Sequence, residues 1–345
     1  MARISRYRIG EEDIDNAIAD LVEMAQGVKG NTDMVQEMIT STIRMARECN
    51  DRGDLKIANA ALKEMRYAFN VFESYRDQKK ASIFGSARTP IDHPLYDLTR
   101  RLAADLANQD WMVITGAGPG IMTAGIEGAG SEMSFGVGIK LPFESTTSQF
   151  ISGDPKLVNF RYFFTRKLMF MKESSGFVLM PGGFGTMDEG FELLTLLQTG
   201  KMMSAPVVFL DEPGGDFWER WDGFIRDSLI EDHYVGENDL NLYLIAKTPE
   251  EATEELIHFY HNYLSQRFVE GIIVLRMKRP ISDEALKAIN KDFSDIVTMG
   301  EIERCEISQE ELKDKDNVDA HRLRFHFDKR HWASLRQIIN RINDF

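Results

Sequence analysis

The stretch GFVLMPGGFGTMDE, residues 176–189, contains the pattern that decides the fold. It opens with an apolar run typical of a strand that is buried on both faces of a sheet. Three glycines follow, at positions 182, 183 and 185, and they allow the backbone to turn tightly and approach a ligand. The amphipathic stretch 187–199 predicts a helix directly after the loop. The start of such a helix favours a bound phosphate, although a plain strand-to-helix turn with a threonine cap gives the same pattern.

The same alternation of strand and helix extends in both directions from this stretch. Apolar runs separated by amphipathic stretches imply a doubly wound, mostly parallel, Rossmann-like sheet with helices on both faces. Its ligands are expected beyond the carboxyl ends of the strands. The predicted strands are 81–84, 111–114, 135–139, 176–180 and 206–210, and the predicted helices are 95–109, 119–130, 157–174, 187–199 and 217–231.

The flanks of the chain have a different texture, which predicts three domains. Residues 1–77 show helical spacing without strands, and we expect a helical N-terminal unit there. Residues 78–265 form the Rossmann-like domain. Residues 266–345 predict a small α+β domain, a ferredoxin-like appendage of order βαββα. Its expected strands are 269–275, 303–307 and 322–327, and its expected helices are 282–297, opened by Ser282, and 331–343.

Composition limits the class of protein. The 345 residues include 41 basic and 55 acidic side chains, and the resulting net charge of −14 disfavours a binder of nucleic-acid backbones. Two cysteines are too few for a disulfide framework, and no run of about 18 apolar residues predicts a membrane span. We therefore expect a cytoplasmic protein with neither membrane nor nucleic-acid partners. The scattered histidines and cysteines predict no metal site.

Two further loops of small residues follow predicted strands. TGAGPGIM, residues 115–122, resembles a dinucleotide fingerprint, but Ile121 stands where the third glycine belongs and the expected acid is displaced to Glu144. GSAR, residues 85–88, ends the first strand. Because the carboxyl ends of parallel strands share one edge of the sheet, these loops and loop 181–186 are expected to meet. Together they favour a phosphorylated, mononucleotide-like ligand.

The segment FRYFFTRKLMFMK, residues 160–172, is unusually rich in aromatic and basic side chains. Most of its aromatic residues are expected in the core, but arginines are rarely buried without a partner. Arg166 could bind a phosphate or carboxylate through its planar fork of donors. The alternative is that Arg166 and Lys167 form salt bridges with Asp188 or Glu189, and the sequence leaves both interpretations open.

These residues match a known pattern. Arg166 and Lys167, followed by PGGFGTMDE at 181–189, resemble the R-K…P-G-G-x-G-T-x-x-E signature of the LOG family, the nucleoside 5′-monophosphate phosphoribohydrolases that activate cytokinins and have been mislabelled as lysine decarboxylases. Related bacterial nucleotide 5′-monophosphate nucleosidases share the arrangement. LPFE at 141–144 is similar to the family's L-P-x-E element, and loop 116–122 to its glycine-rich loop. The resemblance covers about residues 79–235.

The resemblance implies a Rossmann-like homodimer, or a higher homo-oligomer, that needs no cofactor and cleaves nucleoside 5′-monophosphates, AMP or N6-modified AMP, to free base and ribose 5-phosphate. It makes Arg166 and Glu189 the catalytic pair, with Glu189 at the ribose and Arg166 at the departing base. The residues that it assigns to substrate and phosphate binding are Gly182, Gly183, Gly185, Thr186, Lys167, Glu144, Gly85, Ser86, Gly118, Gly120 and Met122.

Two other functions stay open. The same fold could carry a nucleotide or a molybdopterin-type cofactor without hydrolysing it, because fold does not determine function. A carrier, however, has no use for a carboxylate beside the ribose. A lysine decarboxylase would need pyridoxal phosphate on a lysine, and neither Lys167 nor Lys172 lies in a typical setting for that bond.

Overall fold

The computed structural model describes residues 8–25, 30–49, 51–141 and 148–345. The chain divides into two compact units, Met1–Arg66 and Tyr67–Phe345. The predicted domain limits near residues 77 and 265 stay predictions. Among the described residues, no helix has the length and apolar character to cross a bilayer.

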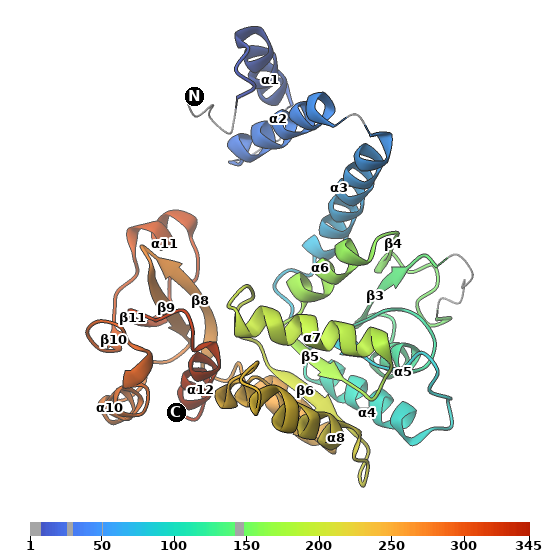
Figure 1. Cartoon of the computed structure of the whole chain (residues 1–345), viewed down its shortest axis with the longest axis vertical. Coiled ribbons are helices and arrows are strands. Elements are labelled where there is room, and N and C mark those ends of the chain that lie inside the picture. The colour runs from blue at the N-terminus through green and yellow to red at the C-terminus, as the bar shows by residue number, and fades with distance from the viewer. Residues whose placement is uncertain (1–7, 26–29, 50, 142–147) are drawn as a thin grey trace. The chain divides into compact units, whose positions relative to one another are not determined.

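The first unit is helical. It contains α1 (Glu12–Met24) and α2 (Thr32–Glu48), which pack against each other and bury Ile18 and Val22. The third helix, α3 (Arg52–Glu73), begins in this unit and ends in the second (Figure 1).

A seven-stranded parallel sheet forms the centre of the second unit, in the order β4-β3-β2-β1-β5-β6-β7. The strands are β1 (Lys80–Phe84), β2 (Met112–Thr115), β3 (Ser134–Ile139), β4 (Leu157–Phe160), β5 (Gly176–Leu179), β6 (Val207–Leu210) and β7 (Leu244–Ala246). The chain winds outward from β1 to β4 and then returns to β5 on the other side of β1. The predicted doubly wound, Rossmann-like sheet is confirmed, and its direction reverses between β1 and β5.

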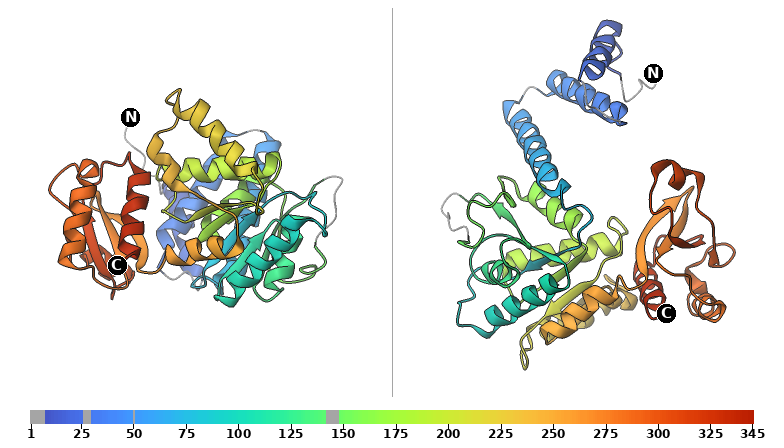
Figure 2. Two further views of the ribbon diagram at one scale, coloured as in Figure 1. Left: turned by 90° about the horizontal axis from the view of Figure 1, so that it is seen from below. Right: turned by 180° about the vertical axis from the view of Figure 1, so that it is seen from behind.

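Helices cover both faces of this sheet. They are α4 (Pro94–Asn108), α5 (Ile121–Ala129), α6 (Phe163–Glu173), α7 (Phe184–Gln198), α8 (Phe217–Phe224), the π-helix η1 (Ile225–Ile230), the 3₁₀-helix η2 (Glu237–Leu242) and α9 (Pro249–His258). Figure 2 shows α4, α5 and α9 together on one side, where Leu102 and Leu256 share a buried cluster with Ile83 of β1. On the other side, Phe84 contacts Phe170 of α6, with ring centroids 4.9 Å apart. Successive residues of β1 therefore face opposite helix layers, as a strand's alternation requires.

Two strands of the sheet differ from the sequence prediction. Residues 157–174 are predicted as one helix, but residues 157–160 form β4, which pairs in parallel with β3, and the helix begins only at Phe163. The alternation within β4 explains this, because Val158 and Phe160 are buried at the sheet edge while Asn159 is exposed. Strand β7, only three residues long, carries too short a pattern to predict.

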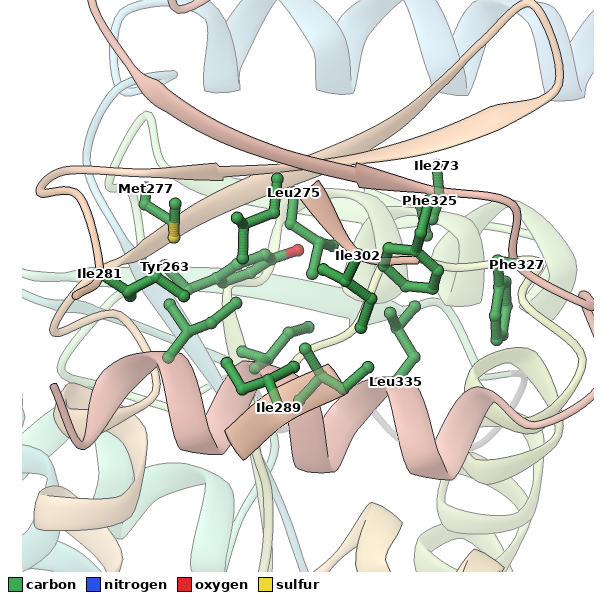
Figure 3. Packing of buried hydrophobic residues seen from close by; sticks show 14 of the residues in the cluster. Tyr263, Ile273, Leu275, Met277, Ile281, Ile289, Ile302, Phe325, Phe327 and Leu335 are labelled. Carbon is green, nitrogen blue, oxygen red and sulfur yellow. The ribbon is translucent and has the colours of Figure 1, made fainter. Parts of the chain in front are cut away.

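Residues 263–345 contain an antiparallel sheet of order β10-β11-β9-β8. The elements are β8 (Tyr263–Val269), β9 (Ile272–Met277), α10 (Asp283–Asp292), the 3₁₀-helix η3 (Ser294–Ile296), β10 (Glu303–Arg304), α11 (Gln309–Asp314), β11 (His321–Phe325) and α12 (Trp332–Asn343). Figure 3 shows their core, in which Leu275 and Phe325 of the sheet point toward Leu335 of α12.

This segment has the predicted α+β composition, but its order differs from the predicted ferredoxin-like βαββα. The stretch 269–275 is predicted as one strand and instead contains a turn between β8 and β9. Glu270 and Gly271 both have positive φ, 49° and 86°, which is the geometry of a two-residue hairpin that follows sheet twist. The segment therefore opens with a hairpin. The predicted cap is present, because the Ser282 hydroxyl accepts from the Ala285 N–H at 3.1 Å at the start of α10.

Candidate functional site

Three loops meet where the winding of the sheet reverses. The Ser86 N–H, after β1, donates to the Pro181 carbonyl, after β5, at 3.3 Å. The Ser86 carbonyl accepts from the Ile121 N–H, at the start of α5, at 3.1 Å. The predicted convergence of these loops is therefore present, and Ser86 is its centre.

Two glycines make this meeting possible. Gly120 has φ +65°, and a Cβ there would lie 2.4 Å from the Ser86 carbonyl oxygen. A Cβ on Gly182 would lie 2.1 Å from Thr186 Oγ1 and 3.1 Å from the Ser86 nitrogen. Any larger residue at either position would push the loops apart.

The loops border a cleft of about 1200 Å³, which is larger than most small-molecule pockets. Gly120 and Lys167 are not among its lining residues, and Glu144 lies outside the described residues. The predicted site residues that line the cleft are Gly85, Ser86, Gly118, Met122, Arg166, Gly182, Gly183, Gly185, Thr186 and Glu189.

Helix α7 begins at the wall of this cleft. Gly183 is its N-cap and Phe184 its first residue. A Cβ added to Gly183 or Gly185 would meet no atom within 4 Å, so both glycines border open space. The first N–H groups of a helix lack partners within that helix and carry the positive end of its dipole. The cleft thus offers an anion a position at the start of α7.

Glu189 lies on the second turn of α7 and is only 6% exposed. Its Oε2 atom is buried and has no hydrogen-bond partner among the described residues. Burial raises the pKa of Glu189 to about 7, against the opposing attraction of Lys167 and Arg166. A buried carboxyl group with a pKa near neutrality, in a cleft, is typical of a functional site.

Arg166 reaches the cleft from α6. Its Nε donates to the Val137 carbonyl of β3 at 2.9 Å, and its guanidinium lies 5.2 Å from the centre of the Phe170 ring. A Cβ on Gly116 would come within 2.4 Å of Arg166 Nη2, so the glycine leaves room for the guanidinium. Burial lowers the pKa of Arg166, while Glu189 acts to raise it. The side chain is thus fixed by the protein before any ligand enters.

The sequence leaves open whether Arg166 and Lys167 form salt bridges with acidic residues of α7. The structure shows such salt bridges for Lys167. Lys167 Nζ lies 2.8 Å from Asp188 Oδ2 and 2.7 Å from Glu192 Oε2, both on α7. Burial acts to lower the pKa of Lys167, but these two partners outweigh it and raise the pKa overall. The nucleotide contact that the resemblance implies for Lys167 stays a prediction, and in this structure its ammonium group is held by two carboxylates.

Several residues of the cleft were not predicted as site residues. Asn159, Lys140 and Phe217 line it, and so does Arg88. The sequence predicts a helix over residues 157–174, and this hides the position of Asn159 near the end of strand β4. Arg88 lies in the loop GSAR, and the position of this loop after the first predicted strand is the feature of the sequence that could identify Arg88 as a site residue. Among the described residues, no three His, Cys, Asp or Glu side chains group as metal ligands would.

Known proteins resemble the central part of the chain. Residues 120–256 match a family described as "possible lysine decarboxylase". A probable cytokinin riboside 5′-monophosphate phosphoribohydrolase of rice, Oryza sativa subsp. japonica, is 30% identical over 91 residues, which are 26% of this chain and 35% of the rice protein. The cytokinin riboside 5′-monophosphate phosphoribohydrolase of Arabidopsis thaliana is also 30% identical over 91 residues, 26% of this chain and 40% of that protein. The matches thus span well under half of these relatives.

Solved structures show a more distant likeness. The molybdenum cofactor binding protein of Rippkaea orientalis is 19% identical with a TM-score of 0.37, over 51% of this chain and 94% of that one. The molybdenum cofactor carrier protein of Chlamydomonas reinhardtii is 20% identical with a TM-score of 0.36, also over 51% and 94%. Likenesses at this level do not bear on function.

The sequence relatives do bear on the predicted resemblance. The family match, residues 120–256, falls on the part of the chain that contains strands β3 to β7 of the parallel sheet. Part of this chain thus resembles the LOG phosphoribohydrolases, as the motifs around Arg166 and Gly182 predict.

Proposed function

We propose that this protein hydrolyses the N-glycosidic bond of nucleoside 5′-monophosphates and releases the free base and ribose 5-phosphate. The observation that carries the proposal is the buried Glu189 carboxyl group, whose Oε2 has no hydrogen-bond partner among the described residues and which shares a cleft with the start of α7. A group that is costly to bury is retained where a ligand supplies its partner.

The 5′-phosphate is proposed to bind at the start of α7. Gly183 and Gly185 leave open space there, and Thr186 adds a hydroxyl group at the same turn. A phosphate in that position would accept from the first N–H groups of the helix and face the positive end of its dipole. Glu189, one turn further along α7, would then lie beside the ribose.

In the reaction, the bond between C1′ and the base nitrogen breaks and its electron pair stays with the base. Water adds its oxygen to C1′, and a proton passes to the base nitrogen. Positive charge develops on the sugar, so the ionised Glu189 stabilises the transition state and positions the attacking water. Arg166, fixed by the Val137 carbonyl, orients the nucleotide and stabilises the charge that develops on the base.

AMP or N6-modified AMP is the proposed substrate, and a second copy of the chain the proposed partner. Phe163 and Phe184 line the cleft and are both exposed, Phe184 by 97%. A large exposed aromatic side chain beside a site is typical of a surface that a ligand or a subunit covers. Sedimentation equilibrium measures the mass: a dimer or larger supports the partner, and a monomer at 39.4 kDa contradicts it.

The second candidate function is a carrier that binds a nucleotide or cofactor and leaves it intact. The size of the cleft, about 1200 Å³, is the observation in its favour, because it exceeds most small-molecule sites. Equilibrium dialysis with AMP, followed by chromatography of the bound fraction, separates the two functions. Tight binding of AMP that is recovered unchanged would support the carrier.

Neither of the two lysines considered for a pyridoxal phosphate bond fits a decarboxylase. Lys167 is held by two carboxylates, and Lys172 is paired with Glu173. Neither lines the cleft, so neither is placed to form a Schiff base there. An absorbance band of protein-bound pyridoxal phosphate in the visible spectrum of the purified protein would contradict this conclusion.

The hydrolase is tested with a panel of nucleoside monophosphates and chromatography of the products. The proposal predicts that Glu189→Gln and Arg166→Ala each lower turnover by about 10²–10⁴-fold. Glu254→Gln, an exposed residue of α9 away from the cleft, is the matched control and keeps normal turnover. Unchanged turnover in both Glu189→Gln and Arg166→Ala would overturn the assigned roles.

A further inference from the structure

Lys167 joins two helices at a point next to the cleft. Its side chain is 15% exposed, and its Nζ reaches from α6 to Asp188 and Glu192 of α7 at 2.8 and 2.7 Å. Two ion pairs from one ammonium group to successive turns of a helix define the relative position of the two helices more tightly than one would. Arg166 precedes Lys167 on α6, and Glu189 follows Asp188 on α7.

The two partners of Lys167 are both neighbours of Glu189. Asp188 precedes it in sequence and Glu192 lies three residues later, on the same side of the helix. Glu189 is therefore one of three carboxylates within five residues of α7. Like charges at this spacing disfavour ionisation, and the buried position of Glu189 reduces the screening by water.

Among the described residues, the charged groups with the largest effect on Glu189 come from these two helices. Lys167 and Arg166 of α6 lower its pKa, whereas Glu192 and Asp188 of α7 raise it. Lys167 acts twice, because it attracts the Glu189 carboxylate directly and also neutralises both acidic neighbours. Arg166 is held by the Val137 carbonyl and, among the described residues, forms no ion pair with Asp188 or Glu192.

We propose that Lys167 is a positioning residue, which ties α6 to α7 and compensates the charges of Asp188 and Glu192 so that Glu189 ionises, and that it does not contact the nucleotide. The chemical use of the ionised Glu189 rests on the function proposed above. The charge compensation itself does not, because it is a property of the protein without substrate.

The direct test is a titration of the Glu189 carboxyl group by ¹³C NMR. The protein is labelled at the glutamate side-chain carboxyl carbon, and the resonance is assigned by its absence in Glu189→Gln. Lys167→Met removes the positive charge, and we expect the midpoint of the Glu189 titration to rise by at least about one pH unit. At pH 7 the ionised fraction would then fall about fivefold from one half.

Four further variants identify the cause of the shift. Lys167→Arg keeps the charge and should restore most of the normal midpoint. Glu192→Gln should lower the midpoint, and Lys167→Met combined with Glu192→Gln should return it toward the normal value. Lys172→Met, on the same helix but paired with Glu173, should leave it unchanged. Should Lys167→Met unfold the protein, Lys167→Gln removes the same positive charge with a polar side chain, and the same upward shift of the Glu189 midpoint is expected.

The pH profile of kcat/KM gives the second measurement. The proposal predicts that the acidic limb moves upward in Lys167→Met while KM, measured well above that limb, changes by less than about threefold. A KM raised tenfold or more with an unmoved limb would mean that Lys167 contacts the nucleotide, and would overturn the proposal, as would an unchanged NMR titration. A wild-type protein that releases no base but shows the predicted titrations would refute the hydrolase and not the role of Lys167.

Discussion

Glu189 combines burial with a position in an open cleft, and both properties follow from its place on α7. The helix starts at the cleft wall, so its first residues face the ligand side while the next turn packs inward. The Glu189 side chain on that turn lines the cleft and is only 6% exposed. The environment rather than the residue type therefore gives Glu189 a pKa of about 7.

The pH dependence of the reaction follows from this pKa. The mechanism needs the ionised carboxylate, so the reaction loses its active form as the pH falls through about 7. We expect kcat/KM for AMP to fall about tenfold for each pH unit below 6 and to reach a plateau above pH 8. Stopped assays from pH 5 to 9 measure the profile. A profile that is flat between pH 5 and 8 would contradict the role of Glu189.

The same pKa predicts an effect on stability. The folded chain binds the Glu189 proton more tightly than the unfolded chain, in which the pKa is near 4.5, so this group makes the fold less stable as the pH rises from about 4.5 to 7. Above pH 7 the cost of the buried charge is about 3 kcal/mol. Glu189→Gln should therefore melt several degrees above the wild type at pH 8.5 and close to it at pH 5.

Calorimetry at the two pH values measures this difference. Glu254→Gln, an exposed substitution of the same kind, should show no such dependence on pH. If Glu189→Gln were less stable than the wild type at pH 8.5, the carboxylate would have a stabilising partner that the geometry does not show.

The sequence predicts the main residues of the site but not their contacts. The motif and its spacing identify Arg166, Glu189 and the glycines of loop 182–185. The structure brings these residues to one cleft. The pairing of Lys167 with Asp188 and Glu192 depends on how two helices pack, which a single sequence does not specify. The sequence does not predict Asn159 as a site residue for a related reason, because its place in the cleft requires β4 to be a strand.

At the scale of elements, the close approach of α4 and α5 depends on one glycine. A Cβ on Gly128 of α5 would lie 2.0 Å from the Arg100 carbonyl oxygen of α4 and 2.9 Å from its Cα. These are backbone atoms, so only a movement of the helices could relieve the clash. We expect Gly128→Ala to lower the free energy of unfolding by about 1–3 kcal/mol.

Urea denaturation measures the change, and Gly223→Ala is the matched control. Gly223 also lies in a helix, α8, but a Cβ there meets no atom within 4 Å. Since alanine has the higher helix propensity, Gly223→Ala should leave stability unchanged or raise it by about 1 kcal/mol. Equal changes in the free energy of unfolding would show that helix propensity, and not the contact with α4, determines the effect of Gly128→Ala.

The elements that the sequence predicts best are those with long or strongly apolar patterns. The five predicted strands of the parallel sheet are all present, because buried parallel strands read as continuous apolar runs. The hairpin of β8 and β9 was hidden by its turn, since Glu270–Gly271 lies inside a stretch that otherwise looks like one strand. Edge strand β4 was hidden by the aromatic residues that follow it, whose spacing suits a helix.

At the scale of the whole molecule, the start of the antiparallel segment is tied to its end. Asn343, 2% exposed on the last turn of α12, accepts from the Asn262 and Tyr263 N–H groups at 2.9 and 2.8 Å. Its Nδ2 donates to the Phe259 carbonyl at 2.6 Å. These bonds hold the last helix to the residues that lead into β8.

Asn343→Ala leaves three buried backbone groups without this partner. Each such group costs about 1–3 kcal/mol, so we expect a loss of at least about 2 kcal/mol in the free energy of unfolding. Asn340→Ala, one turn earlier and less buried, is the control and should cost much less. Chemical denaturation measures both variants. If Asn343→Ala lowers the free energy of unfolding no more than Asn340→Ala does, water must take over the hydrogen bonds that the Asn343 carboxamide makes to these backbone groups.

The central claim concerns a single bond, between C1′ of a nucleoside 5′-monophosphate and its base. Incubation of the full chain with AMP at pH 8, followed by chromatography of the products, tests it most directly. The account predicts equal amounts of adenine and ribose 5-phosphate, with formation of both lowered about 10²–10⁴-fold in Glu189→Gln. Recovery of intact AMP, with or without binding, or the appearance of adenosine and phosphate instead, would contradict it.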